Sequence, residues 1–292
     1  MNIQAWWIAL RPKTLIVSIA PVLLGISLAI YDYELNNILV GILTLISAIM
    51  IQIGTNFIND LYDFLKGADD YKRLGPIRAT QSGLLSQKEI KFGAFISFLI
   101  AFLIGIYLVN VGGMPILIIG TLSLLCGYCY TAGPYPLGYN GLGDIFVFIF
   151  FGLIAVPGTY YLQSGILFDI DSIIIGSSVG FIAVAILCVN NIRDIESDKI
   201  VGKKTLAVRF GIKPIIILYH LMIIFSYISI IILFFKWESP FGLYLVLLSI
   251  PVAIKLMLDI NKKTGKALNY LLADTALFMR LFSILLVIGL LV

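Results

Sequence analysis

Charged residues are scarce in this chain of 292 residues: they make up 12% of the sequence, whereas hydrophobic residues make up 60%. An ordinary soluble domain carries about 25% charged residues, so the composition excludes a soluble globular fold. Apolar runs of about 20 residues recur along the whole sequence, and each is long enough to cross a bilayer. The composition therefore predicts a polytopic membrane protein.

Histidine and cysteine are also scarce, with one histidine and three cysteines. These side chains are the usual ligands of zinc and copper. His220 lies in an apolar run, which favours a packing role. Cys126 and Cys129 form a C-x-x-C inside another apolar run, without the βαβ pattern of a redox motif. Any metal chemistry of this chain is therefore expected to use oxygen ligands.

Nine membrane spans are predicted, at about 14–31, 36–57, 92–110, 114–132, 143–162, 172–190, 213–235, 240–258 and 274–292. No linker or low-complexity tract separates a second domain, so residues 1–292 are predicted to form a single all-α transmembrane domain. The first ten residues lack the pattern of a cleavable signal peptide, and the first span is expected to remain in the mature protein.

The basic residues predict the orientation of these spans. If the N-terminus faces the cytoplasm, nearly all of the 20 lysine and arginine residues fall in cytoplasmic segments, as the positive-inside preference requires. The net charge of +4 is then a signal of topology, and no nucleic-acid recognition fold accompanies it. A multi-pass protein of the inner (plasma) membrane is expected, with its active site on the cytoplasmic side.

Acidic residues number only 16, yet two groups of them lie at the ends of predicted spans, on the same side of the membrane. One group lies in residues 56–69 and the other in residues 190–198. The pattern Asn-x-x-x-Asp occurs in both, as Asn59 to Asp63 and as Asn190 to Asp194. Carboxylates that border hydrocarbon are costly and usually functional, so these two groups are the strongest candidates for chemistry.

Helical spacing brings the polar residues of each group onto one helix face. In the first group these are Asn56, Asn59, Asp60 and Asp63, and in the second they are Asn190, Asp194 and Asp198. Stacked carboxylates repel one another, and a hard cation with oxygen ligands removes the repulsion. Mg²⁺ typically takes one or two carboxylates together with substrate phosphates. Nearby basic residues could hold the remaining phosphate oxygens, namely Lys66, Lys72, Arg73, Arg78, Lys203 and Lys204.

With these groups on the second and sixth of nine spans, the chain resembles the UbiA superfamily of intramembrane aromatic prenyltransferases. Further segments resemble its MenA-like branch, the 1,4-dihydroxy-2-naphthoate polyprenyltransferases of menaquinone biosynthesis: residues 11–15, 66–69, 75–83, 133–144 and 202–208. The wider spacing between Asp63 and Asp69 departs from the general UbiA pattern and fits this branch.

The resemblance implies a helical bundle around a central cavity that binds Mg²⁺, a polyprenyl diphosphate and an aromatic acid. The prenyl group would be transferred with loss of diphosphate and CO₂, giving demethylmenaquinol, and no protein partner would be required. The implied metal ligands are Asn59, Asp63, Asp69, Asn190, Asp194 and Asp198.

The remaining candidates fall into three sets. The substrate-binding candidates are Arg11, Lys66, Arg73, Arg78, Gln81, Tyr135, Tyr139, Arg193, Lys203 and Lys204. The catalytic candidates are Asp60 and Asp144, either of which could act as a base toward the acceptor, and Lys66 at the leaving diphosphate. Aromatic faces could stabilise an allylic cation, and the candidates by sequence are Tyr62, Tyr128, Tyr135 and Tyr139.

Two alternatives remain open at this point, and a third lacks its sequence motif. Another aromatic acceptor, 4-hydroxybenzoate or homogentisate, would keep the superfamily and change the branch. A membrane transporter would also place acidic residues and prolines in its spans. The CDP-alcohol phosphotransferases bind metal and diphosphate as well, but their D-x-x-D-G-x-x-A-R string is absent from the sequence.

Overall fold

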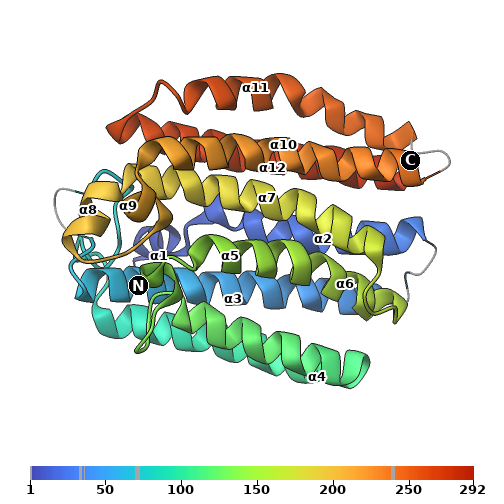
Figure 1. Ribbon diagram of the computed structural model, residues 1–292. Helices are drawn as coiled ribbons and strands as arrows, with labels where there is room; N and C mark the ends of the chain where they lie inside the picture. Colours follow the sequence, from blue (N-terminus) through green and yellow to red (C-terminus); the bar gives the residue numbers. More distant parts are fainter. Residues whose placement is uncertain (1, 33–34, 36, 70–72, 238–240) are drawn as a thin grey trace.

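The computed structural model describes residues 2–32, 35, 37–69, 73–237 and 241–292, and the regular structure in that part of the chain is helical throughout. Figure 1 shows long helices that run side by side, with the connecting segments gathered at two ends. The elements are α1 (Ile3–Leu10), η1 (Pro12–Thr14), α2 (Ile16–Tyr31), α3 (Ile38–Leu65), α4 (Gln87–Cys129), η2 (Leu137–Asn140), α5 (Gly143–Phe148), the π-helical η3 (Ile149–Ile154), α6 (Ala155–Ser164), α7 (Ile170–Arg193), α8 (Ile195–Ile200), α9 (Leu206–Phe210), α10 (Ile212–Lys236), η4 (Phe241–Ser249), α11 (Ile250–Asp259), η5 (Gly265–Ala267) and α12 (Leu268–Leu291).

The membrane-spanning helices agree with the sequence prediction. In the described chain, seven helical stretches are long and apolar enough to cross a membrane, and the bent pair formed by residues 3–14 and α2 gives an eighth. The backbone of α4 leaves the helical region at Gly113, where φ is 65°. Phe98 and Leu124 line the same small surface pocket, although a straight helix would place them about 39 Å apart. The chain therefore turns back at Gly113, and counting both arms of α4 gives the predicted nine spans.

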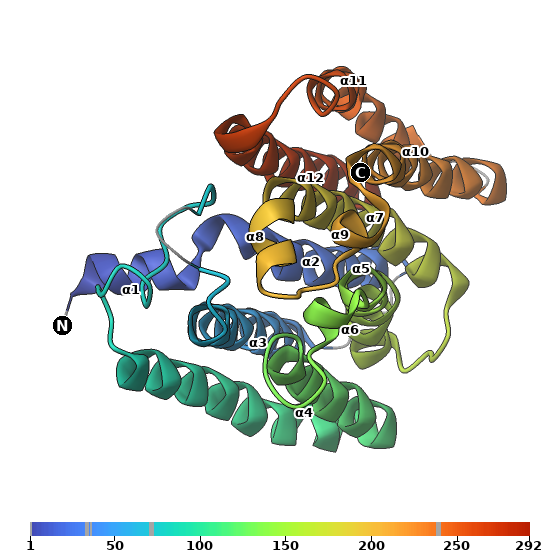
Figure 2. The same ribbon diagram turned by 60° about the vertical axis from the view of Figure 1, so that its left-hand side comes forward.

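Helix α7 is the most enclosed span, and it packs against α2, α5, α10 and α12 (Figure 2). Glycines permit its close approach to η3: a Cβ atom at Gly180 would lie 2.6 Å from the Cα atom of Gly152, and one at Gly176 would overlap the backbone oxygen of Gly152. Small residues commonly allow such backbone contact between membrane helices. This contact fixes α5 and η3 beside α7, and both α5 and the end of α7 carry candidate site residues.

The closeness of this contact predicts the effect of adding one methyl group. Gly176→Ala is expected to destabilise the protein by about 1–3 kcal/mol, because the backbones must move apart. The measurement is the Tm of the purified protein in detergent. Gly105→Ala is the matched control, since a Cβ atom there meets nothing within 4 Å. A wild-type Tm for Gly176→Ala would show that the contact with Gly152 is not tight.

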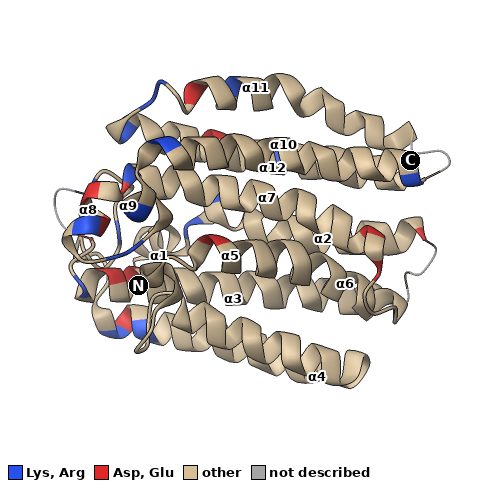
Figure 3. Ribbon diagram, in the orientation of Figure 1, with Lys and Arg blue, Asp and Glu red and all other residues tan. Residues whose placement is uncertain are grey.

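Most charged side chains lie at one end of the bundle, and few lie at the other (Figure 3). This polar end comprises the C-terminal turns of α3 and α7 and the connecting segments 66–86, 130–142 and 194–211, among the described residues. Large hydrophobic side chains are exposed on the outer helix faces between the two ends, as at Phe95, Ile118 and Phe235. The protein is therefore an integral membrane protein with one chemically elaborate end.

Candidate active site

A cavity of about 1310 Å³ lies at the polar end and continues along α3 from Asp63 to Thr44. The axial distance between these residues is about 28 Å. Aspartate, asparagine, arginine and lysine residues line the mouth, the part near Asp63, while most of the deeper wall is apolar, with Ile51, Leu108, Ile116 and Phe151 among its residues. The cavity thus joins a polar mouth to a long apolar channel.

The last two turns of α3 present Asn59 and Asp63 to this cavity. One carboxylate oxygen of Asp63 accepts a hydrogen bond of 2.8 Å from the Tyr139 hydroxyl, and the other lies 3.9 Å from Nη2 of Arg78. The side-chain oxygen of Asn59 accepts a hydrogen bond from the Thr131 hydroxyl. These two of the three predicted ligands of the first group therefore lie at the mouth, with their oxygens turned toward other polar groups.

Asp69 is brought back beside Asp63 by a turn that follows α3. Gly67 adopts a φ of 75°, and the N–H of Ala68 donates to the Asp63 carbonyl at 2.8 Å. The carboxylate of Asp69 pairs with Arg73 through Oδ1 and lies 3.2 Å from Nε of Arg78 through Oδ2. Burial raises the pKa of Asp69 to about 6, and the Arg73 guanidinium opposes this shift.

The second group lies where α7 ends and α8 begins. Arg193 donates two hydrogen bonds to Asp194, of 2.7 and 2.6 Å, and a third of 2.7 Å to Oδ1 of Asn190. Burial opposes ionisation of Asp194, but Arg193 more than offsets it and lowers the pKa of this carboxyl. Asp198 is 3% exposed and lies 3.3 Å from Nζ of Lys203. Burial raises the pKa of Asp198 to about 6.

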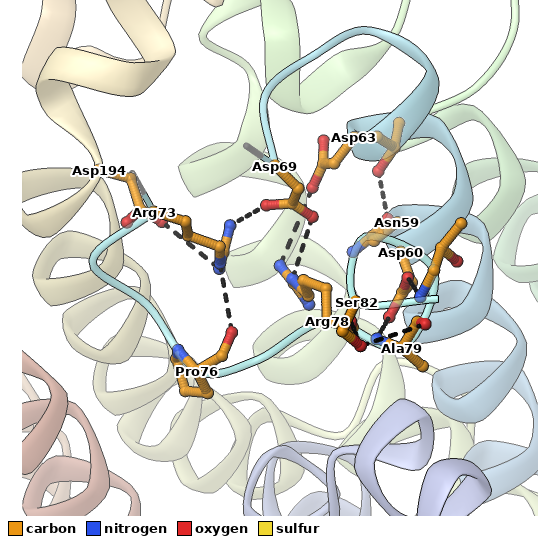
Figure 4. A network of polar contacts seen from close by, with 12 residues as sticks. Asn59, Asp60, Asp63, Asp69, Arg73, Pro76, Arg78, Ala79, Ser82 and Asp194 are labelled. Atoms are coloured by element: carbon orange, nitrogen blue, oxygen red, sulfur yellow. Dashed lines mark hydrogen bonds and ion pairs between the residues drawn. The ribbon is translucent and has the colours of Figure 1, made fainter. Parts of the chain in front are cut away.

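Arg73 connects the two groups across the mouth of the cavity. Its Nη1 pairs with Asp69, and its Nη2 lies 4.0 Å from Oδ2 of Asp194 (Figure 4). These acidic residues are more than a hundred positions apart in the sequence. The structure therefore brings together the two polar groups that the sequence singled out.

Tyr139 holds two lysines beside the same mouth. Nζ of Lys66 lies 4.1 Å from the centroid of the Tyr139 ring, and Nζ of Lys203 lies 5.2 Å from it. Lys66 also donates a hydrogen bond of 2.7 Å to the carbonyl of Thr131. Burial and the nearby Asp63 raise the pKa of the Tyr139 hydroxyl, so this group remains a hydrogen-bond donor to the carboxylate.

Asp144 lines the cavity from the first turn of α5 and is 7% exposed. Its Oδ1 has no hydrogen-bond partner among the described residues. Tyr130 also lines the cavity and packs against the start of α5, where its hydroxyl would lie 2.8 Å from a Cβ atom at Gly143. A buried carboxylate oxygen without a partner, beside a cavity, is available to a bound molecule.

Several predicted residues do not reach the cavity. Asp60 is one, because both of its carboxylate oxygens accept hydrogen bonds from backbone N–H groups, those of Ala79 and Thr80. Tyr62 and Tyr128 are paired with each other through their hydroxyls, 3.1 Å apart. The other predicted residues absent from the cavity wall are Lys66, Gln81, Tyr135, which is 61% exposed, and Lys204. Lys72 lies outside the described residues.

Arg11 and Asn190 line the cavity as predicted candidates, and three unpredicted residues contribute to the site: Tyr130, Thr131 and Asn269. Oδ1 of Asn269 accepts a hydrogen bond of 3.0 Å from Arg193, and its Nδ2 donates one of 2.7 Å to the carbonyl of Leu74. Tyr130 and Thr131 lie just before residues 133–144, one of the segments that resemble the MenA-like branch. Asn269 belongs to no motif, so nothing in the sequence indicated it.

The residues at the mouth fit a hard divalent cation by their chemistry. Among the residues that the structure describes, no three acidic, histidine or cysteine side chains converge on one point, because arginines cover several carboxylate oxygens. All the candidate ligands nevertheless offer oxygen, which Mg²⁺ and similar cations prefer. Oδ2 of Asp198 is buried without a partner in the described chain, and such an oxygen is suited to a cation.

Comparisons with known proteins identify related sequences. The model of the UbiA prenyltransferase family matches residues 18–284. The chain is 36% identical to the 1,4-dihydroxy-2-naphthoate octaprenyltransferase of Haemophilus influenzae, with 100% of this chain and 97% of that protein covered. It is 39% identical to the protein of that name from Escherichia coli, with 86% and 83% covered.

Solved structures share the fold. The apo structure of a UbiA homolog from Aeropyrum pernix has a TM-score of 0.68 at 16% identity and covers 92% of this chain and 96% of its own. A UbiA homolog from Archaeoglobus fulgidus, bound to GPP and Mg²⁺, has a TM-score of 0.65 at 17% identity, with 97% and 99% covered. The family match and the close sequence relatives together confirm the resemblance: this chain belongs to the UbiA prenyltransferase family.

Proposed function

We propose that the protein transfers a polyprenyl group from a polyprenyl diphosphate to 1,4-dihydroxy-2-naphthoate, releasing diphosphate and CO₂ and forming demethylmenaquinol for menaquinone biosynthesis. One observation carries this proposal: two acidic groups and several cations meet at the mouth of a deep apolar cavity. The mouth suits a diphosphate, and the channel suits an isoprenoid tail. The names of relatives that match nearly the whole chain support this acceptor.

The cations at the mouth would hold the diphosphate. Arg73, Arg78 and Lys203 pair with carboxylates of the acidic groups, and Lys66 lies over the ring of Tyr139 beside them. Charge-assisted hydrogen bonds from such residues to phosphate are strong. The proposed metal ligands are Asn59, Asp63, Asp69, Asn190, Asp194 and Asp198. Bound Mg²⁺ would supply electrostatic stabilisation of the leaving diphosphate.

The apolar channel would protect the reacting carbon. The bond between the first prenyl carbon and the diphosphate oxygen breaks, and the electron-rich ring of the acceptor forms a carbon–carbon bond to that prenyl carbon. The acceptor carboxyl group leaves as CO₂. Apolar walls exclude the water that would otherwise react with an allylic cation. Asp144 is the proposed base, because its unpaired oxygen can take the proton of an acceptor hydroxyl and return it after CO₂ has left, so that the product is the quinol.

The role of Asp144 predicts a selective loss of turnover. Asp144→Asn is expected to lower kcat roughly 100-fold, the lower end of the range for general base catalysis, while the KM for the prenyl donor stays near the wild-type value. Steady-state kinetics with purified protein would measure both constants. Asp171→Asn is the control, because Asp171 pairs with Lys236 at the opposite end of the bundle. Unchanged kcat in Asp144→Asn would assign the base to another group.

The proposed function is tested with purified protein in liposomes, radiolabelled geranylgeranyl diphosphate, Mg²⁺ and one acceptor at a time. Formation of a labelled lipid with CO₂ from 1,4-dihydroxy-2-naphthoate is the expected result. Labelling of 4-hydroxybenzoate or homogentisate alone would show that the acceptor is wrong, and cation-dependent flux without product would favour a transporter.

We also propose that the polar end faces the cytoplasm. Sealed inverted vesicles should then use an external water-soluble donor, and right-side-out vesicles should not.

A further inference from the structure

Residues 73–80 form a segment without helix or strand that passes beside the mouth of the cavity. We call it the arginine segment, because it begins at Arg73 and carries Arg78. Pro76 and Ile77, between the two arginines, also line the cavity. Irregular segments are usually mobile, yet both guanidinium groups lie against buried carboxylates. Other parts of the structure must therefore hold this segment in place.

Asp60 on α3 anchors one end of the arginine segment. Its two carboxylate oxygens accept hydrogen bonds from consecutive backbone N–H groups, at 3.1 Å from Ala79 and 3.0 Å from Thr80. Asp60 is 1% exposed, so both oxygens of a buried carboxylate hold backbone N–H groups outside the cavity wall. Arg78 directly precedes this anchored pair (Figure 4).

Asn269 on α12 anchors the other end. Its side-chain N–H donates to the carbonyl of Leu74 at 2.7 Å, directly after Arg73. The side-chain oxygen of Asn269 accepts from Arg193 at 3.0 Å, and Arg193 in turn holds Asp194. One amide therefore links the arginine segment to the second acidic group.

We propose that Asp60 and Asn269 are positioning residues, which fix the arginine segment between α3 and α12 so that Arg73 and Arg78 can bind a diphosphate. The identity of the ligand rests on the proposed function. Neither residue lies where it could carry a proton for the acceptor: Asp60 is outside the cavity wall, and Asn269 is neutral. Their effect on the reaction passes through the two arginines.

The test is a set of double-mutant cycles with the prenyl donor and acceptor titrated separately. Asp60→Asn places an amide N–H opposite two backbone donors, and Asn269→Ala removes both hydrogen bonds. Each is expected to raise the KM for the donor roughly 10- to 100-fold, as losses of such supporting contacts do, and to leave the KM for the acceptor near the wild-type value. In an Arg78→Ala background, Asp60→Asn should raise the KM for the donor little further. In an Arg73→Ala background, the same is expected of Asn269→Ala, because the effects of coupled residues are not additive.

Matched controls are Asn261→Ala, whose amide donates to the carbonyl of Met257 and lies 3.3 Å from Nε2 of His220 at the same end of the bundle, and Asp171→Asn at the other end. Fully additive effects, or equal changes in both KM values, would overturn the proposal. Asp60→Glu, which retains the carboxylate, should recover part of the donor affinity if the variant folds.

A second measurement is independent of turnover. Trypsin cleaves after Arg73 and Arg78, so folded Asp60→Asn and Asn269→Ala should be cut in the arginine segment faster than the wild type, and inorganic pyrophosphate with Mg²⁺ should slow the cut in the wild type. Equal cutting rates would contradict the anchoring. If the wild type forms no prenyl product with any acceptor, the proposed function fails. The cutting rates would still test whether Asp60 and Asn269 anchor the arginine segment.

Discussion

Asp194→Asn is expected to lower kcat on the order of 1,000-fold, the upper part of the range for loss of one preorganised electrostatic group. The pKa of Asp194 lies below its usual value because Arg193 outweighs the effect of burial. The wild-type side chain is therefore a carboxylate at neutral pH, and the substitution removes a full negative charge from the proposed metal site. An asparagine of nearly equal size leaves the mouth sterically unchanged.

The loss should come from chemistry and not from unfolding. Arg193 keeps its hydrogen bonds to Asn190 and Asn269 in the variant, so its buried charge retains two acceptors. A decrease of about 1–3 kcal/mol in the free energy of unfolding is expected from the weakened pair, visible as a lower Tm. Asp171→Asn serves as the charge-matched control. Near-normal prenyl transfer by Asp194→Asn at saturating Mg²⁺ would show that the two acidic groups do not act together.

Removal of divalent cations is expected to abolish prenyl transfer. Without a cation, the carboxylates at the mouth are neutralised by Arg73, Arg78 and Arg193, and the leaving diphosphate lacks the stabilisation that a metal supplies. We expect at least a 1,000-fold lower rate in EDTA, in keeping with the contribution of strong electrostatic stabilisation. Excess Mg²⁺ should restore the rate.

A binding measurement separates metal loss from damage by the chelator. Mg²⁺ together with inorganic pyrophosphate should raise the Tm of the wild-type protein, because a ligand that binds only the folded state stabilises it. The rise should be smaller in Asp198→Asn, which lacks the buried carboxylate oxygen that has no partner within the described residues. Full activity in EDTA, after removal of bound metal, would exclude the cation-dependent mechanism.

The helical bundle was predictable because its spans are continuous apolar runs, and runs of this length in a membrane form helices. The residues at which the helices begin and end were less predictable. Helix α3 continues to Leu65, beyond the predicted end at 57, and the polar side chain of Asp60 in these last turns is satisfied by the backbone N–H groups of Ala79 and Thr80. Helix α4 starts at Gln87, earlier than predicted, and its first turn is stabilised by a capping box of Ser86 and Glu89.

The acidic groups were visible in the sequence, but the different roles of the residues within them were not. Asn56 and Asp60 share a helix face with Asn59 and Asp63, as spacing predicts. That face is wide, and its two edges meet different neighbours. Asn56, Asn59 and Asp63 line the cavity, and Asn56 also donates to the carbonyl of Leu10, whereas Asp60 lies outside the cavity wall and holds the arginine segment. Only the tertiary structure reveals those neighbours, and the same holds for Asn269.

The cavity joins a polar mouth to an apolar channel inside one protein, and this has a consequence for how product and leaving group separate. Under the proposed function, diphosphate leaves from the charged end toward water, while the new lipid already has its tail at hydrocarbon depth. The two products partition into different phases as they form. Reversal would require both products and CO₂ to meet again at the boundary, so the separation of the products into two phases opposes the reverse reaction.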